Sequence, residues 1–308
     1  MTRALIAGAS GFVGRALVTE LLERGVTVRC LVRDTQSASS LELGRAGCEL
    51  RRGDVIRPET LAGVADGVDI AYYLVHLMAS DGGALAARER GAAGAFAREC
   101  RRGGVARMIY LGGLGDAGAS EHLGSRHGTA GTLRSEGPPL TYFRAGLVVG
   151  AGSESYALLR ALVDLPGETI LAPEWIHNRT QPIGIDTVVR YLVRAGLDDE
   201  VRDREIQLGG PEVMTYAELV DRMAEALGEP RMRRVAVRGL SVGAAGRGAG
   251  AITPGDPRVA AHITAGLATD TVVTDPSGAE SFEIKPESLA IALAKAIEAE
   301  AQAEEDGG

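Results

Sequence analysis

Short aliphatic runs alternate with longer segments of helical periodicity through the first half of the chain. The runs that predict buried β-strands are 4–7, 26–32, 49–52, 68–75, 108–111 and 140–143. The segments with the period of an amphipathic helix are 13–24, 83–102 and 129–136. Strands that alternate with helices indicate βαβ units, in which the strands run parallel and the helices cover the sheet. The expected fold class is therefore α/β, with a doubly wound parallel sheet.

After Gly150 the expected elements are shorter and less regular. Helices are predicted at 155–163, 186–195, 215–227 and 286–301, with a short strand at 206–208 and an irregular stretch at 164–179. Asp186 is expected to cap the second of these helices, and Thr215 with Glu218 has the spacing of a capping box at the start of the third.

This change of pattern predicts two regions along the chain. Residues 1–150 form the domain built on the sheet, and residues 151–302 form a smaller C-terminal region that is interleaved with it. The segment 238–270 begins with a stretch rich in Gly, Ala and Arg and is expected to form a lid. Residues 303–308 are expected to form an acidic, frayed tail.

Composition and charge exclude several classes of function. The net charge is −8 and no dense basic block occurs, which argues against a nucleic-acid partner. No aliphatic run approaches the roughly 20 residues that cross a membrane, and the chain enters its first strand without room for a signal peptide. Cys30, Cys48 and Cys100 are scattered, as is typical of reduced thiols. The expectation is a cytoplasmic protein with a small-molecule partner and no metal; the oligomeric state stays open.

A glycine-rich turn, Gly8-Ala9-Ser10-Gly11-Phe12-Val13-Gly14, links the first strand to the first helix. Gly8 permits the tight turn, Gly11 lets the backbone approach a pyrophosphate, and Gly14 lets the helix pack on the sheet. Amide groups at the helix N-terminus then face the phosphates. A turn of this form between a strand and a helix predicts a Rossmann dinucleotide-binding domain, in which Ser10, Phe12 and Val13 also lie beside the cofactor.

Residues at the ends of the second and third strands are expected to contact the adenosine part of the dinucleotide. Arg33 and Asp34 end the second strand, and an Arg there favours the 2′-phosphate of NADP, so NADPH is the expected cofactor. In the alternative, Arg33 is a solvated surface residue and Asp34 holds the ribose. Asp54, followed by Val55, comes after the third strand and is placed to accept a hydrogen bond from the adenine; alternatively it is a turn residue.

Taken together, these features resemble the extended and atypical short-chain dehydrogenases/reductases, in particular their NmrA-like branch, over residues 2–230. The segments that carry the resemblance, beside the glycine turn, are 53–55, 104–111, 140–146, 207–211 and 215–219. The resemblance implies cofactor contacts after the fourth, fifth and sixth strands, from Leu74, Val75, His76, Gly112, Ala145 and Gly146.

The chain departs from this family at the catalytic positions. Active members carry a Ser after the fifth strand and a Tyr-x-x-x-Lys pair, whereas this strand runs into Gly112-Gly113 and no Tyr here precedes a Lys by four residues. Counted back from Arg144, the Lys position is Arg126 and the Tyr position is His122. An imidazole donates protons near neutral pH, and a guanidinium supplies fixed positive charge. His122 and Arg126 are therefore the candidate catalytic pair, and Arg126 is also expected to lie beside the cofactor; alternatively, both cap a helix on the surface.

The substrate side is expected to involve the irregular stretch and the segments around it. Trp175, the only Trp, suits a flat or apolar ligand; alternatively, it packs the domain junction. His177 and Gln181 lie in the same part of the chain, and Tyr156 is a further candidate to close the pocket.

The function most consistent with these features is an NADPH-dependent ketoreductase of a specialised metabolite, such as an aromatic polyketide in antibiotic biosynthesis. The proton would come from His122, from a water, or from an acidic hydroxyl of the substrate. Two alternatives stay open. One is an NADPH-dependent reductase of a carbon–carbon double bond, and the other is a non-catalytic NAD(P)-binding sensor.

Overall fold

The computed structural model describes residues 2–77, 83–116, 118, 121–165, 169–198, 203–231, 233–237, 239, 241–252, 264 and 266–307. Its centre is a seven-stranded sheet in the order β11-β6-β5-β4-β1-β2-β3, in which every neighbouring pair is parallel. The strands of this sheet are β1 (Arg3–Ala7), β2 (Thr27–Val32), β3 (Glu49–Arg52), β4 (Ile70–Tyr73), β5 (Arg107–Gly113), β6 (Leu140–Ala145) and β11 (Glu205–Leu208). The predicted α/β class with a doubly wound parallel sheet is confirmed.

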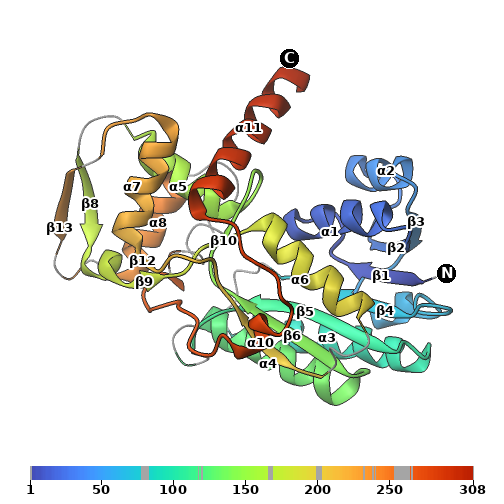
Figure 1. Cartoon of the computed structure of the whole chain (residues 1–308). Helices are drawn as coiled ribbons and strands as arrows, with labels where there is room; N and C mark the ends of the chain where they lie inside the picture. The colour runs from blue at the N-terminus through green and yellow to red at the C-terminus, as the bar shows by residue number, and fades with distance from the viewer. Residues whose placement is uncertain are drawn as a thin grey trace.

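Helices cover both faces of the sheet (Figure 1). On one face α1 (Phe12–Glu23) packs beside α6 (Ile185–Leu197), and on the other α3 (Gly83–Arg102) packs beside α4 (Glu121–Glu136). The alternation of side chains along a strand explains the two cores, because Ile6 of β1 joins the cluster under α1 and α6 while Leu5 joins the cluster with α3. Two further short elements flank the sheet at its β3 side, α2 (Ala38–Arg45) and the 3₁₀ helix η1 (Pro58–Leu61).

The C-terminal part adds a second lobe, seen on the left of Figure 1. Its helices are α5 (Glu154–Val163), α7 (Tyr216–Leu227) and α8 (Val242–Ile252), and they lie beside a parallel strand pair of β8 (Thr169–Pro173) and β13 (Arg233–Val237). A third apolar cluster holds α5, α7 and α11 (Leu289–Gly307) together. The stretch 164–179 was expected to be irregular, but it contains β8 and the 3₁₀ helix η2 (Glu174–His177).

Short strand pairs and one small helix connect the lobe to the sheet. The pairs are β7 (Val148–Val149) with β10 (Ile183–Gly184), and β9 (Arg179–Thr180) with β12 (Met214–Thr215). The small helix α10 (Ser277–Glu280) packs on β11. The final helix α11 is longer than predicted, running to Gly307 and carrying the C-terminal end away from the body (Figure 1). Among the described helices, none has the length and hydropathy needed to cross a bilayer.

One predicted helix cap is confirmed and another is wrong. Thr215 and Glu218 form the expected capping box of α7, with the Glu218 amide donating to Thr215 Oγ1 at 3.1 Å and the Thr215 amide donating to Glu218 Oε2 at 2.7 Å. The N-cap of α6 is Gly184, not Asp186. Asp186 lies in the first turn of α6, where its carboxylate accepts a hydrogen bond from Lys295 of α11. The Asp186 carboxylate therefore binds Lys295, which is distant in the sequence, and does not cap the helix.

The predicted lid falls partly on described residues. Within 238–270, residues 242–252 form α8, and residues 253–263 lie outside the described part of the chain. Closure of this segment over a ligand stays a prediction.

Candidate functional site

The glycine turn has a geometry that only glycine permits at two of its positions. Gly8 has φ +92°, and a Cβ there would lie 2.7 Å from the Leu74 carbonyl oxygen. A Cβ at Gly14 would overlap the Gly8 carbonyl oxygen and lie 2.8 Å from Ala9 Cα. The first glycine thus allows the turn, and the third allows helix α1 to approach the strand, as predicted.

The start of helix α1 is open to an anionic ligand. Its N-cap is Gly11, which has no side chain to satisfy the first amides, and no acidic residue lies in the first turn. The nearest atom to a Cβ built at Gly11 is the Gly8 carbonyl oxygen, at 3.3 Å. Because glycine has no Cβ, the turn carries no side chain at this position. Unsatisfied helix N-terminal amides favour phosphate groups. These residues fit the pyrophosphate of a dinucleotide.

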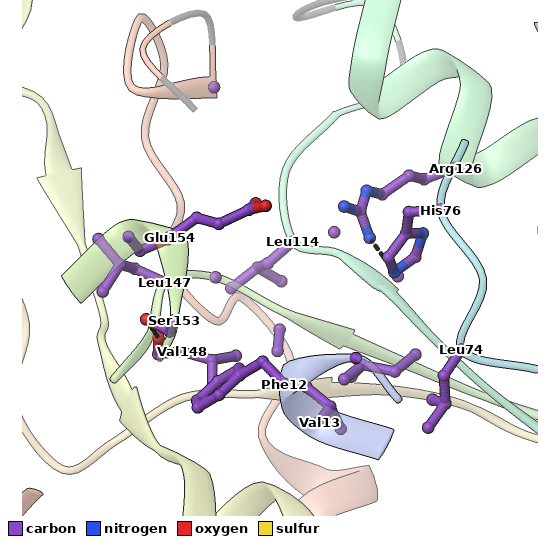
Figure 2. Close-up of a pocket in the computed structure, with 18 of the residues that line it drawn as sticks. Phe12, Val13, Leu74, His76, Leu114, Arg126, Leu147, Val148, Ser153 and Glu154 are labelled. Atoms are coloured by element: carbon purple, nitrogen blue, oxygen red, sulfur yellow. Dashed lines mark hydrogen bonds between the residues drawn. The ribbon is translucent and has the colours of Figure 1, made fainter. Parts of the chain in front are cut away.

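A cavity of about 450 Å³ extends from this turn across the carboxyl ends of the strands (Figure 2). Its lining includes eleven of the predicted cofactor residues: Gly8, Gly11, Phe12, Val13, Gly14, Leu74, His76, Gly112, Arg126, Ala145 and Gly146. They come from the β1–α1 turn and from the segments that follow β4, β5 and β6, together with α4. In an open α/β sheet this edge is where ligands bind.

Arg126 and His76 form the main polar pair of this cavity. Arg126 Nη1 lies 2.8 Å from His76 Nε2, although the two residues are 50 positions apart. A guanidinium can only donate, so Nε2 accepts and the imidazole proton is assigned to Nδ1. In Figure 2 the pair lies across the cavity from Glu154, whose carboxylate extends inward from the start of α5. One wall of the cavity is therefore cationic and the opposite wall carries an acid.

The two glycines that replace the family's Ser are explained by their surroundings. A Cβ at Gly112 would lie 2.8 Å from Tyr142 Cε2, and one at Gly113 would lie 2.6 Å from Leu123 Cδ2. The space that a Ser side chain would need is filled by these apolar groups.

Six of the predicted cofactor residues are absent from the described lining of the cavity: Ser10, Arg33, Asp34, Asp54, Val55 and Val75. Arg33 and Asp34 are exposed just after β2, and Asp34 Oδ1 accepts the amide of Gln36 at 2.9 Å. Asp54 Oδ1 accepts the amide of Ile56 at 3.0 Å, which is the turn role that the sequence left open. Contact of these six residues with a cofactor stays a prediction.

Of the four predicted substrate residues, one lines a cavity. Trp175 lies in a second cavity of about 510 Å³, beside the first. The other three lie outside the two described linings, and their contact with a substrate stays a prediction. Tyr156 is buried, and its hydroxyl donates to Glu300 Oε2 at 2.9 Å, so it joins α5 to α11. His177 is exposed. The side chain of Gln181 donates from Nε2 to the Gly210 carbonyl oxygen and accepts at Oε1 from the Val273 amide. Neither described cavity lining includes Tyr156, His177 or Gln181.

Two further histidines, His122 and His127, belong to helix α4. The backbone of His122 lies in the first turn of α4, but its side chain is outside the described part of the structure. His127 is absent from the described lining of the cavity, and its Nε2 lies 3.0 Å from the Gly115 carbonyl oxygen.

Sequence reasoning missed Tyr216 and Thr271, which both line the first cavity. Thr271 Oγ1 donates to Thr180 Oγ1 at 3.0 Å, so the Tyr216 hydroxyl, 2.8 Å away, donates to Thr271. These three residues are far apart in the sequence, and no local pattern links them. The one available signal was the capping box at Thr215, which fixes the start of α7 and thereby the position of Tyr216.

The fold and this cavity define a Rossmann protein built to bind a nicotinamide dinucleotide. The model of the NAD(P)H-binding family matches residues 8–191. The chain belongs to this family, which accords with the resemblance to NmrA-like, atypical short-chain dehydrogenases/reductases found in the sequence.

Curated relatives match only part of the chain. A 3β-hydroxysteroid dehydrogenase/Δ5→4-isomerase of Mycobacterium tuberculosis is 32% identical over 137 residues, which cover 39% of this chain and 36% of that protein. The photosystem II assembly factor Ycf39 of Trieres chinensis is 42% identical over 64 residues, covering 21% and 19%. The chain thus spans about a third or less of the length of these relatives.

Solved structures match nearly the whole chain at low identity. The structure of gox2253 has a TM-score of 0.76 at 19% identity and covers 99% of both chains. The NADPH-dependent quinone oxidoreductase QOR2 of Escherichia coli, complexed with NADPH, has a TM-score of 0.72 at 18% identity and covers 94% of this chain and 98% of its own. WbmH of Bordetella bronchiseptica, in complex with NAD⁺, has a TM-score of 0.71 at 15% identity, covering 98% and 99%. These likenesses show the fold.

Proposed function

We propose that this protein is an NADPH-dependent reductase that transfers hydride to the carbonyl carbon of a specialised metabolite. One observation carries the proposal: the glycine turn and the Arg126–His76 pair line a single cavity. The turn supplies amides for a diphosphate, and the pair lies beyond it, past the ends of β4 and β5. This separation suits a molecule with phosphates at one end and a reacting ring at the other.

Arg126 occupies the position of the family's Lys and serves as the positively charged group of the site. When bound, the reduced nicotinamide supplies the hydride. The guanidinium of Arg126 provides fixed positive charge and several donors beside the reacting carbonyl, where negative charge develops on oxygen as the hydride adds to carbon. Its bond to His76 holds the guanidinium in place, so the donors need little reorganisation during the reaction.

The proton that completes the reduction adds to the carbonyl oxygen. Tyr216 is a poor candidate in this arrangement because its hydroxyl proton is directed to Thr271. His122, a water, or an acidic hydroxyl of the substrate are the proposed sources. The last source suits an aromatic polyketide, in which a phenol beside the carbonyl stabilises the alkoxide. A cytoplasmic tailoring step of antibiotic biosynthesis is the proposed setting.

The preference for NADPH rests on Arg33. Its side chain is exposed just after β2 and makes no hydrogen bond or ion pair among the described residues. It is thus available to a 2′-phosphate at the position where such a cation discriminates between the two dinucleotides. The solved neighbours include complexes with both NADPH and NAD⁺, so the fold alone does not decide.

The proposal is tested by binding and by turnover. NADPH fluorescence titrated with the protein reports binding, and loss of NADPH absorbance with a panel of ketones, enones and quinones reports reduction. Binding with alcohol products supports the proposal. Saturated ketones formed from enones would support a double-bond reductase instead, and binding without turnover over the whole panel would support a sensor.

A further inference from the structure

A second cavity opens beside the dinucleotide cavity. It has a volume of about 510 Å³ and lies among α5, α7, α8 and η2 in the C-terminal lobe. The two cavities share four lining residues, Leu147, Ser155, Tyr216 and Leu267. They therefore adjoin at these residues.

The chemistry of the second lining differs sharply from that of the first. None of the described residues that line it is charged. Its polar side chains, apart from the indole, are Ser155, Tyr216 and Thr264, and the Tyr216 hydroxyl is already bonded to Thr271. The indole Nε1 of Trp175 is buried without a hydrogen-bond partner among the described residues and stays available as a donor, while the rest of the ring contributes apolar surface. An ionised group brought here would lose its hydration without a counter-charge from the described lining, which disfavours its binding.

The composition of α8 creates the space. The helix reads Val-Gly-Ala-Ala-Gly-Arg-Gly-Ala-Gly-Ala-Ile, and its residues Ala244, Ala245, Gly248 and Ala249 line the cavity. Opposite them stand large aliphatic side chains of α5, including Leu158, Leu159 and Leu162. Small residues on one wall and large ones on the other leave a volume in the range that holds a drug-sized ligand, about 300–1,000 Å³.

We propose that this cavity binds the body of the substrate, and that the substrate is an uncharged ketone whose body is mainly hydrocarbon. The hydrocarbon body lies against Trp175 and α8, and the carbonyl lies at the junction beside Leu147 and Tyr216, directed into the dinucleotide cavity. This assignment rests on the proposed reductase function and narrows its substrate class. It excludes phosphorylated and carboxylated substrates, because the described lining offers no cation to pair with them.

Trp175 makes the cavity observable, since it is the only Trp in the chain. The probes are a matched pair of methyl ketones, 2-decanone and 9-oxodecanoate, which differ by the carboxylate at the far end of the chain. Each is titrated into the full-length protein while Trp175 emission is recorded, with and without NADPH. We expect saturable binding of 2-decanone and at least about tenfold weaker binding of 9-oxodecanoate.

Two substitutions on α8 form a matched pair. Ala245 lines the cavity, whereas Ala251 is exposed on the same helix and outside the described lining. Ala245→Phe should fill the cavity and raise the Kd for 2-decanone at least about tenfold, and Ala251→Phe should leave it unchanged. If Ala245→Phe does not fold, Gly248→Leu replaces it, because a Cβ at Gly248 meets nothing within 4 Å; Gly243→Leu is then the control.

NADPH binding, measured in the same samples, separates this proposal from the reductase function. Equal affinity for the two ketones, or equal effects of the two Phe substitutions, would overturn the cavity assignment while NADPH binding still stands. A wild-type protein that binds 2-decanone selectively but no dinucleotide would keep the apolar site and overturn the reductase function.

Discussion

Arg126 Nη1 lies 2.8 Å from His76 Nε2, and this contact joins helix α4 to the segment after β4 at the far end of the dinucleotide cavity. Neither residue belongs to the catalytic set of the family, yet together they place a fixed positive charge where a reacting carbonyl would lie.

Removal of that charge should affect turnover more than cofactor binding. Arg126→Ala is expected to lower kcat/KM for carbonyl reduction at least about 100-fold, because the donor to the developing oxyanion is lost. Arg126→Lys keeps the charge and should retain activity within about tenfold of wild type. Steady-state NADPH oxidation measures both variants. If Arg126→Ala reduces ketones at the wild-type rate, this residue has no part in the chemistry.

The third glycine of the turn is expected to be essential to the fold of the site. Gly14→Ala places a Cβ against the Gly8 carbonyl, so α1 must move away from β1 and dinucleotide binding should be lost. Gly91→Ala is the control, since Gly91 lies in α3 and a Cβ there meets nothing within 4 Å. That control should gain about 0.5–1 kcal/mol of stability. Thermal unfolding and NADPH titration distinguish them; normal NADPH affinity in Gly14→Ala would contradict the packing argument.

The preference between the two dinucleotides is expected to depend on Arg33. Arg33→Ala should weaken NADPH at least about tenfold and leave NADH nearly unchanged, since only the former carries a 2′-phosphate. Arg101→Ala, an exposed cation on α3, controls for the change in net charge. Fluorescence titrations of each protein with both dinucleotides give the dissociation constants. An equal loss for NADPH and NADH would mean that Arg33 does not read the phosphate.

Acid should loosen the contact between Arg179 of β9 and Asp270. The Arg179 amide donates to Asp270 Oδ1 at 2.7 Å and the guanidinium binds Oδ2, and these hydrogen bonds lower the pKa of Asp270 below 3.8. A carboxyl whose pKa is lower in the folded state stabilises the fold above its unfolded pKa. That stabilisation is lost as the pH falls through the folded pKa.

Asp270→Asn tests this dependence. The variant should unfold at lower denaturant than wild type at neutral pH, and the difference should shrink as the pH falls below 3.8. A difference that stays constant down to acid pH would show that the carboxylate charge is not responsible.

The sequence predicted those parts of the molecule whose causes are local. The seven strands of the central sheet, the glycine turn and the α7 capping box depend on neighbours within a few residues, and each was found where expected. Contacts between distant segments were not predictable in this way. The Lys295 partner of Asp186 and the Glu300 partner of Tyr156 come from α11, more than 100 positions away. The capping role of Asp186, inferred from local spacing, is wrong because the N-cap of α6 is Gly184.

The site shows the same division between local and distant causes. The Lys-equivalent position was located as Arg126 from the family pattern, but its bond to His76 emerges only when β4 and β5 are side by side. The short helix α2 was also missed. It is fixed by a Ser37 cap and a serine cluster rather than by a long apolar period.

The place of β11 in the sheet means that the two halves of this chain cannot be treated as separable modules. β11 pairs with β6 along Tyr142–Ala145, and α6 contributes Val188 and Leu192 to the apolar cluster over β1. A fragment ending at residue 150 would expose an unpaired backbone edge and a bare hydrophobic sheet face, both of which promote self-association. The central sheet, whose other six strands lie within residues 3–145, is thus complete only after Glu205–Leu208 has been synthesised.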